Sequence, residues 1–177
     1  ETVYRLYADL DSANHNIFGL SGTATDALTV NTTTSFFHDV AWGGNFQWNI
    51  STAFLGHPFF PDAEYDSWWT LGDAHASPPT TTTTPTVVTG NWTFGSGNFS
   101  LGGTVATQGA IARVPTDQEC FGVLNASTGA YRVLLGQFTT DGDVSGSVNL
   151  TGNNTSQTNP WAVNQVAFSS TGGASNN

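Results

Sequence analysis

The sequence predicts an all-β protein, an antiparallel β-sandwich of jelly-roll kind. About ten to thirteen short segments alternate apolar and polar residues, and turns rich in Gly, Asn and Thr separate them. No segment has the sustained 3.6-residue apolar period of an amphipathic helix. The chain has 177 residues, 12% of them aromatic, which is enough for a domain with its own core.

The N-terminal segment, residues 2–10, is the first expected strand. Side chains alternate along it, and bulky groups occupy both faces, so we expect both faces to be covered. One face carries Tyr4, Leu6, Ala8 and Leu10, and the other carries Val3, Arg5, Tyr7 and Asp9.

More strands are expected before residue 73. In residues 45–54 aromatic and polar side chains alternate most clearly, and Gly43-Gly44 before them predicts a hairpin turn. After a loop, the strand at residues 65–72 follows. The weaker expected strands are residues 17–20, 27–32 and 35–42.

A low-complexity tract at residues 77–86 interrupts this pattern. Its prolines and threonines favour an extended, exposed connection. We expect the tract to join two parts of one domain that spans residues 1–177, and a boundary between two small domains is the alternative. Its candidates for O-glycosylation are Thr80, Thr81, Thr82, Thr83 and Thr84.

Residues 131–138 are almost continuously apolar and predict a central strand in the second half of the chain. The turn at residues 140–143 then predicts a hairpin to the strand at residues 144–151. The other expected strands are residues 87–94, 97–101, 103–114, 121–124 and 161–169.

The charge excludes several classes of partner. The chain has three basic residues, no lysine and a net charge of −10, so nucleic acid and anionic membrane surfaces are not expected partners. No apolar run reaches the roughly 18 residues that a membrane span needs. The first residue is Glu1 and methionine is absent. This fits a secreted protein whose signal peptide has been removed, and a trimmed chain is the alternative.

Eight Asn-X-Ser/Thr sequons are the strongest functional signal, about twice the number that composition alone gives. The sequence pattern places them on outward faces of strands or in turns, which predicts a secreted, N-glycosylated protein. The alternative is that Asn and Thr simply occupy polar faces. The acceptors are Asn31, Asn49, Asn91, Asn98, Asn125, Asn149, Asn153 and Asn154.

Catalytic and metal motifs are missing. The four histidines and the single cysteine have no zinc-binding spacing, and no serine lies in a nucleophile motif. Asp62, Glu64 and Asp66 are the one carboxylate cluster. They are candidates for calcium, as are Asp9 and Asp11, and for glycoside hydrolysis, with a solvated acidic rim as the alternative. No other cofactor is expected besides covalent glycans.

Two further residue types leave alternatives open. Cys120 excludes an internal disulfide and is expected as a buried thiol, with a bridge between chains as the alternative. Trp42, Trp68, Trp69 and Trp92 could offer flat faces to sugars, although alternating tryptophans in a sandwich usually fill the core. The adjacent Trp68 and Trp69 must point to opposite faces, one into the core and one under another layer.

Two segments resemble a family. Residues 60–72, FPDAEYDSWWTLG, fit the pattern F-P-x-x-E-Y-D-S-W-x-T-x-G, and residues 133–146 are similar to V-L-L-A-Q-L-T-T-x-G-x-x-S-G. These patterns resemble secreted proteins of algae and marine bacteria and subunits of glycosylated extracellular fibrils. Trp69 departs from them, since a small aliphatic residue is more usual there. The resemblance implies an extracellular β-domain and transfers no catalytic residue.

We therefore expect a non-enzymatic, structural extracellular glycoprotein that assembles with itself into a filament or surface coat. The assembly strand would be residues 1–10, centred on Val3, Tyr4, Arg5, Leu6 and Tyr7, donated to the sheet of a neighbouring copy. The alternatives are a sugar-binding module that uses an exposed tryptophan of residues 65–72, and, third, a polysaccharide hydrolase.

Overall fold

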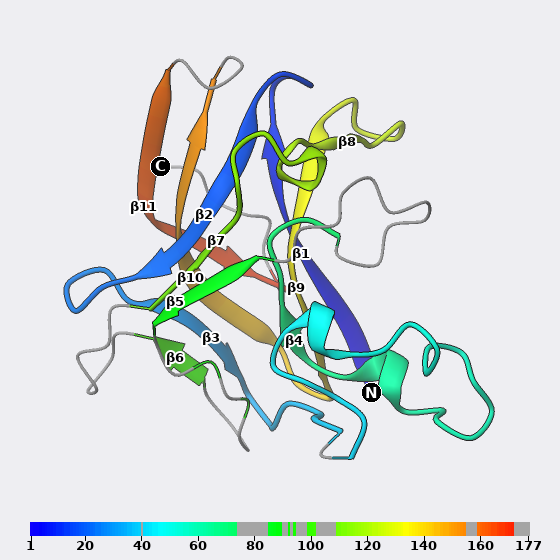
Figure 1. The fold of residues 1–177 in the computed structure, drawn as a ribbon. Coiled ribbons are helices and arrows are strands. Elements are labelled where there is room, and N and C mark those ends of the chain that lie inside the picture. The colour runs from blue at the N-terminus through cyan, green and yellow to red at the C-terminus, as the bar shows by residue number, and fades with distance from the viewer. Residues whose placement is uncertain are drawn as a thin grey trace.

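The structure, a computed structural model, describes residues 1–39, 41–73, 85–89, 92, 94, 99–101, 109–154 and 159–171. Within this part of the chain, eleven strands form two antiparallel sheets that pack face to face (Figure 1), which confirms the predicted β-sandwich. The strands are β1 (Thr2–Leu10), β2 (Asn16–Gly22), β3 (Leu28–Thr32), β4 (Trp68–Trp69), β5 (Thr86–Thr89), β6 (Phe99–Leu101), β7 (Gly109–Ala112), β8 (Val123–Leu124), β9 (Tyr131–Thr140), β10 (Val144–Asn153) and β11 (Pro160–Ser169).

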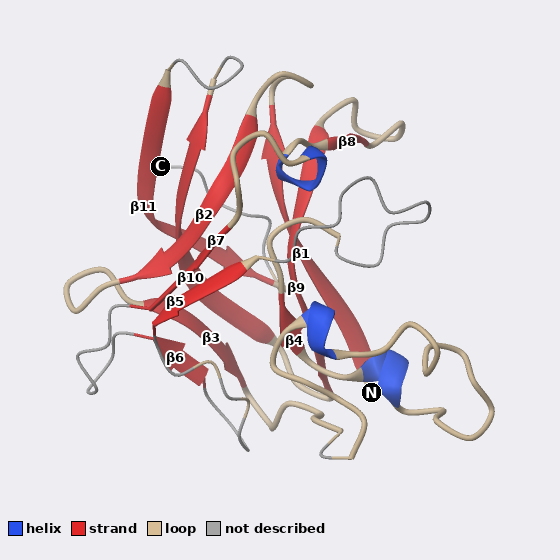
Figure 2. Cartoon of the chain, in the orientation of Figure 1, coloured by secondary structure: helices blue, strands red, loops and turns tan. Residues whose placement is uncertain are grey.

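The smaller sheet has four strands in the order β1-β9-β4, with β8 also paired to β9. The larger sheet has the order β5-β7-β2-β10-β3-β6, with β11 on the other edge of β10. In the described ranges, helical structure is confined to three short 3-10 helices at the margins of the sandwich (Figure 2). They are η1 (Gln47–Asn49), η2 (Ala63–Tyr65) and η3 (Gln118–Cys120).

β9 is the central strand of the smaller sheet, as its apolar run predicts. The prediction of a hairpin at residues 140–143 is wrong, because β9 and β10 do not pair: β9 belongs to the smaller sheet and β10 to the larger one. This turn therefore carries the chain from one layer of the sandwich to the other. The 77–84 part of the proline- and threonine-rich tract, with Thr80 to Thr84, lies outside the described residues.

The expected strand at residues 45–54 is also wrong. The segment forms η1 and a series of turns instead, whose backbone hydrogen bonds span three residues. Only its first residues reach the sheet, where Trp69 N–H donates to Asn45 O and Phe46 forms an isolated bridge with Trp69. The Gly43-Gly44 hairpin is absent too, because Gly43 N–H donates to Asp39 O and Gly44 N–H donates to the Asp66 carboxylate. Of the strand expected at residues 65–72, only Trp68–Trp69 pairs in a ladder.

The main core lies between the two sheets. Its largest fully buried side chains are Trp69 and Phe138 from the smaller sheet and Ile17, Leu20 and Leu28 from the larger one. A second, smaller apolar cluster contains Ile50, Trp68 and Leu134, with Leu55 packed against it. Because side chains alternate along strands, this cluster lies on the outer face of the smaller sheet.

The two segments that carry the family resemblance pair directly with each other. Trp68 and Trp69 lie opposite Gln137 and Gly136 in the ladder between β4 and β9. The Gln137 side-chain amide donates hydrogen bonds of 2.9 Å to the backbone oxygens of Glu64 and Asp66. These residues therefore hold the sheet together.

Candidate functional site: an edge strand and the groove beside it

β1 is an edge strand that depends on one neighbour. It pairs with β9 from Thr2 opposite Thr140 to Leu10 opposite Tyr131, and no other described strand pairs with it. The predicted alternation is confirmed, since Tyr4, Leu6 and Ala8 pack on the core. The expected cover on the opposite face is absent, because Val3 and Tyr7 are each 38% exposed.

A short loop connects β1 to the rest of the chain. Residues 11–15 lead from the smaller sheet to β2 in the larger sheet, and Asp11, Ala13 and Asn14 are exposed there. At the other end, the Glu1 ammonium group lies 3.0 Å from the Asp141 carboxylate, and both groups are solvated. β1 is thus attached through one ladder, its inner side chains and a solvent-exposed loop.

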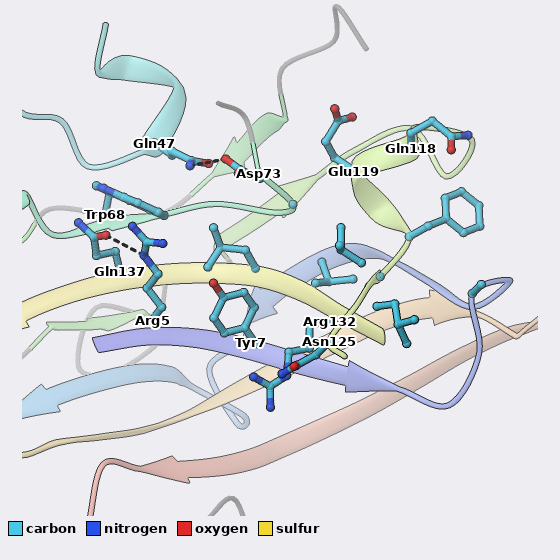
Figure 3. Close-up of a pocket in the computed structure, with 18 of the residues that line it drawn as sticks. Arg5, Tyr7, Gln47, Trp68, Asp73, Gln118, Glu119, Asn125, Arg132 and Gln137 are labelled. Carbon is cyan, nitrogen blue, oxygen red and sulfur yellow. Dashed lines mark hydrogen bonds between the residues drawn. The ribbon is translucent and has the colours of Figure 1, made fainter. Parts of the chain in front are cut away.

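A groove of about 1110 Å³ lies on the outer face of the smaller sheet, beside the second apolar cluster. β1, β9 and β8 contribute to it, together with η1, η3 and the segment around Trp68 (Figure 3). Its apolar lining includes Ile50, Leu55, Trp68 and Leu134. Its polar lining includes Arg5, Tyr7, Gln47, Asp73, Glu119 and Arg132.

Two arginines reach this groove from adjacent strands. Arg5 on β1 donates from Nε to Gln137 Oε1 at 3.2 Å (Figure 3). Arg132 on β9 donates from Nε to Asp9 Oδ1 at 2.8 Å, and its guanidinium carbon lies 5.7 Å from the centre of the Tyr7 ring. The guanidinium groups and the tyrosine ring therefore share one face of the sheet.

The third arginine is structural. Arg113 is buried, donates from Nε to the Leu71 backbone oxygen at 2.9 Å, and contacts the carboxylates of Asp117 and Glu119 at 3.1 and 3.5 Å. Gly72 is tightly fitted here: its φ is +78°, and a Cβ would lie 2.2 Å from the Glu119 backbone oxygen. This buried ion pair anchors the loop before β8 to the strand that carries Trp68.

The structure does not bring Asp62, Glu64 and Asp66 together as a metal site. The expected alternation fails because η2 occupies residues 63–65, and no group of three metal-ligating side chains occurs among the described residues. Asp62 and Glu64 are exposed, whereas Asp66 is fully buried. Asp9 is engaged by Arg132, and Asp11 is exposed.

Asp66 instead fastens the loop at residues 38–44. Its carboxylate accepts hydrogen bonds from Asp39 N–H at 2.8 Å and Gly44 N–H at 2.6 Å, and it contacts His38 Nδ1 at 3.0 Å. Burial raises the pKa of Asp66, and these backbone bonds and His38 partly offset the increase. His38 therefore pairs with Asp66 rather than with its neighbour Asp39.

The sequons have very different environments. Asn49 is exposed at the end of η1, and Asn31, Asn125 and Asn154 are half-buried. Asn91 and Asn98 lie outside the described residues. Asn149, predicted to face outward, and Asn153, predicted to lie in a turn, are both buried side chains of β10.

Asn149 is buried where β10 changes partners. β10 pairs with β3 up to Ser147 and with β2 from Asn149 onward. Asn149 Nδ2 donates to the backbone oxygens of Ser21 and Asp26, and Oδ1 accepts from Gln165 N–H. Its amide therefore closes a fork in the sheet and does not fit a glycan attachment site.

Three of the four tryptophans occupy buried positions, as expected of tryptophans in a sandwich, and neither tryptophan of residues 65–72 is exposed for the sugar-binding alternative. Trp69 is 0% and Trp92 4% exposed, and both belong to the main core. Trp68 points to the opposite face, as predicted, and is covered there by Ile50. Trp42 is 46% exposed, but it lies far along the chain from residues 65–72 and packs against Phe54 and Phe60.

Cys120 is a buried thiol, which agrees with the first of its two expected roles. Its Sγ lies 3.5 Å from the Val114 backbone oxygen, and burial raises its pKa to about 12. A thiol that is buried and protonated is not placed for a disulfide between chains.

Sequence reasoning missed the groove. Arg5 and Tyr7 were expected together on one face of β1, but that face was expected to be covered, and Arg132, Gln137 and Asp73 carried no recognisable signal. The rarity of cations was the available clue to the groove. Two of the three arginines, Arg5 and Arg132, fall within segments predicted to be strands that pack on the core.

None of the helices in the described ranges has the length and apolar character needed to cross a membrane. Comparisons with models of protein families, with curated proteins and with solved structures found no match to the chain.

Proposed function

We propose that the chain is a non-enzymatic, structural extracellular glycoprotein whose copies assemble into a filament or surface coat by exchanging β1. The observation that carries this proposal is the attachment of β1: an N-terminal edge strand with one partner, β9, joined to the body by an exposed five-residue loop. Such a strand can leave its own sheet by extending the loop at residues 11–15.

The contacts of β1 support exchange because they can be remade in a neighbour. When β1 leaves, the backbone of β9 loses its pairing partner, and the core loses the cover of Tyr4, Leu6 and Ala8. A second copy's β1 restores the same ladder and the same burial. Because each copy gives its strand to the next copy, the contact is head-to-tail and continues into an open chain.

Surface features fit an extracellular assembly. The exposed acceptor Asn49 and the half-buried Asn31, Asn125 and Asn154 are the glycosylation candidates that we retain among the described residues. The chain has no lysine to protect strand edges from pairing with other chains, which agrees with an edge that is used for assembly.

A cysteine pair across the ladder tests the exchange directly. Asp9 and Arg132 are register partners whose side chains touch, so the variant Asp9→Cys/Arg132→Cys places two thiols together. Oxidised polymers should give a ladder of covalent oligomers on a non-reducing gel, because each disulfide would join two copies. The buried Cys120 does not compete, since its thiol stays protonated.

The matched control is Ser145→Cys/Ser169→Cys, which links the exposed register partners of β10 and β11. It should give monomers on the same gel. Polymers whose Asp9→Cys/Arg132→Cys disulfides all lie within one chain would refute the exchange. Deletion of residues 1–10 should likewise give only soluble monomers by electron microscopy, and intact polymers from that variant would contradict the proposal.

A further inference from the structure

Two of the three arginines of this acidic chain line one groove. Arg113 is buried in its ion pair, and the Glu1 ammonium group faces Asp141. Arg5 and Arg132 both line the groove on the outer face of the smaller sheet. Each uses Nε for a bond within the protein, and among the described residues neither has a hydrogen bond from its terminal Nη nitrogens.

Three acids also line the groove: Glu64 is exposed, and the other two have partners within the protein. Asp73 Oδ1 accepts a hydrogen bond of 2.7 Å from Gln47 Nε2, and Glu119 contacts Arg113 at 3.5 Å. The remaining negative charges lie mostly outside the groove, and at physiological ionic strength charges are screened over about 8 Å. Two planar donor groups with unused N–H bonds are well suited to carboxylate or sulfate oxygens.

The rest of the lining suits sugar rings. Tyr7 lies beside Arg132 with 38% of its surface exposed, so its ring can pack against a flat apolar face. Amide groups both donate and accept hydrogen bonds, as hydroxyl groups require. Five amides line the groove, and those of Asn14, Gln118 and Asn125 are at least partly exposed, whereas Gln47 and Gln137 are buried and bonded within the protein.

The size of the groove accommodates an extended polar chain, and the sheet beneath it excludes a peptide strand. Its volume of about 1110 Å³ lies near the upper end of the roughly 300–1,000 Å³ typical of ligand pockets. β9 forms the centre of the sheet beneath the groove, and it pairs with β1 on one edge and with β4 and β8 on the other. An acidic peptide therefore cannot add itself to β9 as a strand and would be recognised through side chains alone.

We propose that this groove binds an acidic oligosaccharide, with Arg5 and Arg132 holding its carboxylate or sulfate groups and Tyr7 packing against a sugar ring. This site goes beyond the assembly role. It forms whether β1 belongs to the same copy or to a neighbour, and in an exchanged assembly two copies would build each groove. An assembled coat would then be able to bind acidic polysaccharide along its length.

The test is isothermal titration calorimetry with two probes that differ only at C6: β-1,4-linked tetramannuronate and β-1,4-linked mannotetraose. At 0.15 M salt we expect the acid to bind at least tenfold more tightly than the neutral sugar. Arg5→Gln/Arg132→Gln should remove most of this preference. A carrageenan tetrasaccharide sulfate provides the second acidic arm and separates sulfate from carboxylate recognition.

Matched variants separate recognition from general electrostatics. Arg5→Lys/Arg132→Lys keeps both charges but loses the planar donor groups, so affinity should fall about threefold to tenfold. Tyr7→Leu should weaken both the acidic and the neutral probe. Circular dichroism checks that each variant folds, and light scattering follows assembly separately, so a failure of strand exchange is distinguishable from a failure of binding.

Four results would overturn the proposal. The first is no binding of either acidic probe, and the second is equal affinity for the acid and mannotetraose. The third is equally tight binding of hexaglutamate, which would replace the saccharide with an acidic peptide. Undiminished binding of the acid by the folded glutamine double variant would show that the arginines do not form the site.

Discussion

The two faces of the smaller sheet are covered in different ways. The inner face packs on the larger sheet and buries Trp69 completely, together with Phe138. The outer face is covered by the irregular segment around η1 and η2, which buries Trp68 but leaves the groove open beside it. Sheet-on-sheet packing fills the space between layers, whereas an irregular cover leaves room for a ligand.

The difference between the two faces should show most strongly in the loss of stability when each of the adjacent tryptophans is truncated. Trp69→Ala removes a side chain from the middle of the core and should cost about 3–5 kcal/mol of unfolding free energy. Trp68→Ala empties a site bordered by turns and the groove, so its neighbours can relax and the loss should be about 1–2 kcal/mol smaller. Urea denaturation of both variants measures the difference, and equal losses would show that the outer cover is as rigid as the core.

The attachment of the outer cover gives the second prediction. Asp66→Asn replaces an acceptor of two backbone N–H groups with an amide and should destabilise the fold by about 2–3 kcal/mol. Burial raises the pKa of Asp66 above its ordinary value of 3.8 in the folded state. The folded state therefore binds this proton more tightly than the unfolded chain does.

The stabilisation from that proton is fully present below pH 3.8 and is lost as the pH rises through the raised pKa. The free-energy difference between the wild type and Asp66→Asn should therefore be largest near pH 3.5 and shrink toward neutrality. Unfolding curves at pH values from 3.5 to 7 measure it. A difference that grows with pH would mean that the hydrogen-bond donors, with His38, outweigh burial.

The same contrast explains what the sequence could predict. β1, β9 and β10 follow from alternation and an apolar run, because regular strands in a sandwich bury one or both faces. The alternation of residues 45–54 is just as clear, yet β9 has no free edge for them, since β4 and the residues after it occupy that side. The irregular cover thus depends on sheet topology, which periodicity does not contain.

Buried polar residues show the same limit. The alternation of apolar and polar residues along β10 predicts that Asn149 faces outward. It is buried because it lies where β2 and β3 diverge and where β11 bulges at Gln165. Gln137 lies in an apolar run, and its amide bonds reach backbone oxygens more than seventy positions away. The groove was missed for this reason, because its residues meet only after distant segments pack.

The smallest expected effect probes the tight inner face. A Cβ at Gly136 would lie 2.8 Å from Phe138 Cζ and 3.1 Å from the Trp68 backbone oxygen. Gly136→Ala should therefore cost about 1–2 kcal/mol of unfolding free energy by overpacking.

Phe138→Leu shortens the side chain that the new methyl group meets, and the pattern that residues 133–146 resemble has Ala and Leu at these two positions. The double variant should be about 1 kcal/mol more stable than the sum of the single effects. Phe36→Leu is the matched control, because Phe36 packs against Phe138 but is not among the atoms closest to the new Cβ, so it should give no such rescue. Additive effects in the Gly136–Phe138 cycle would place the strain at the Trp68 backbone, on the β4 side of the sheet.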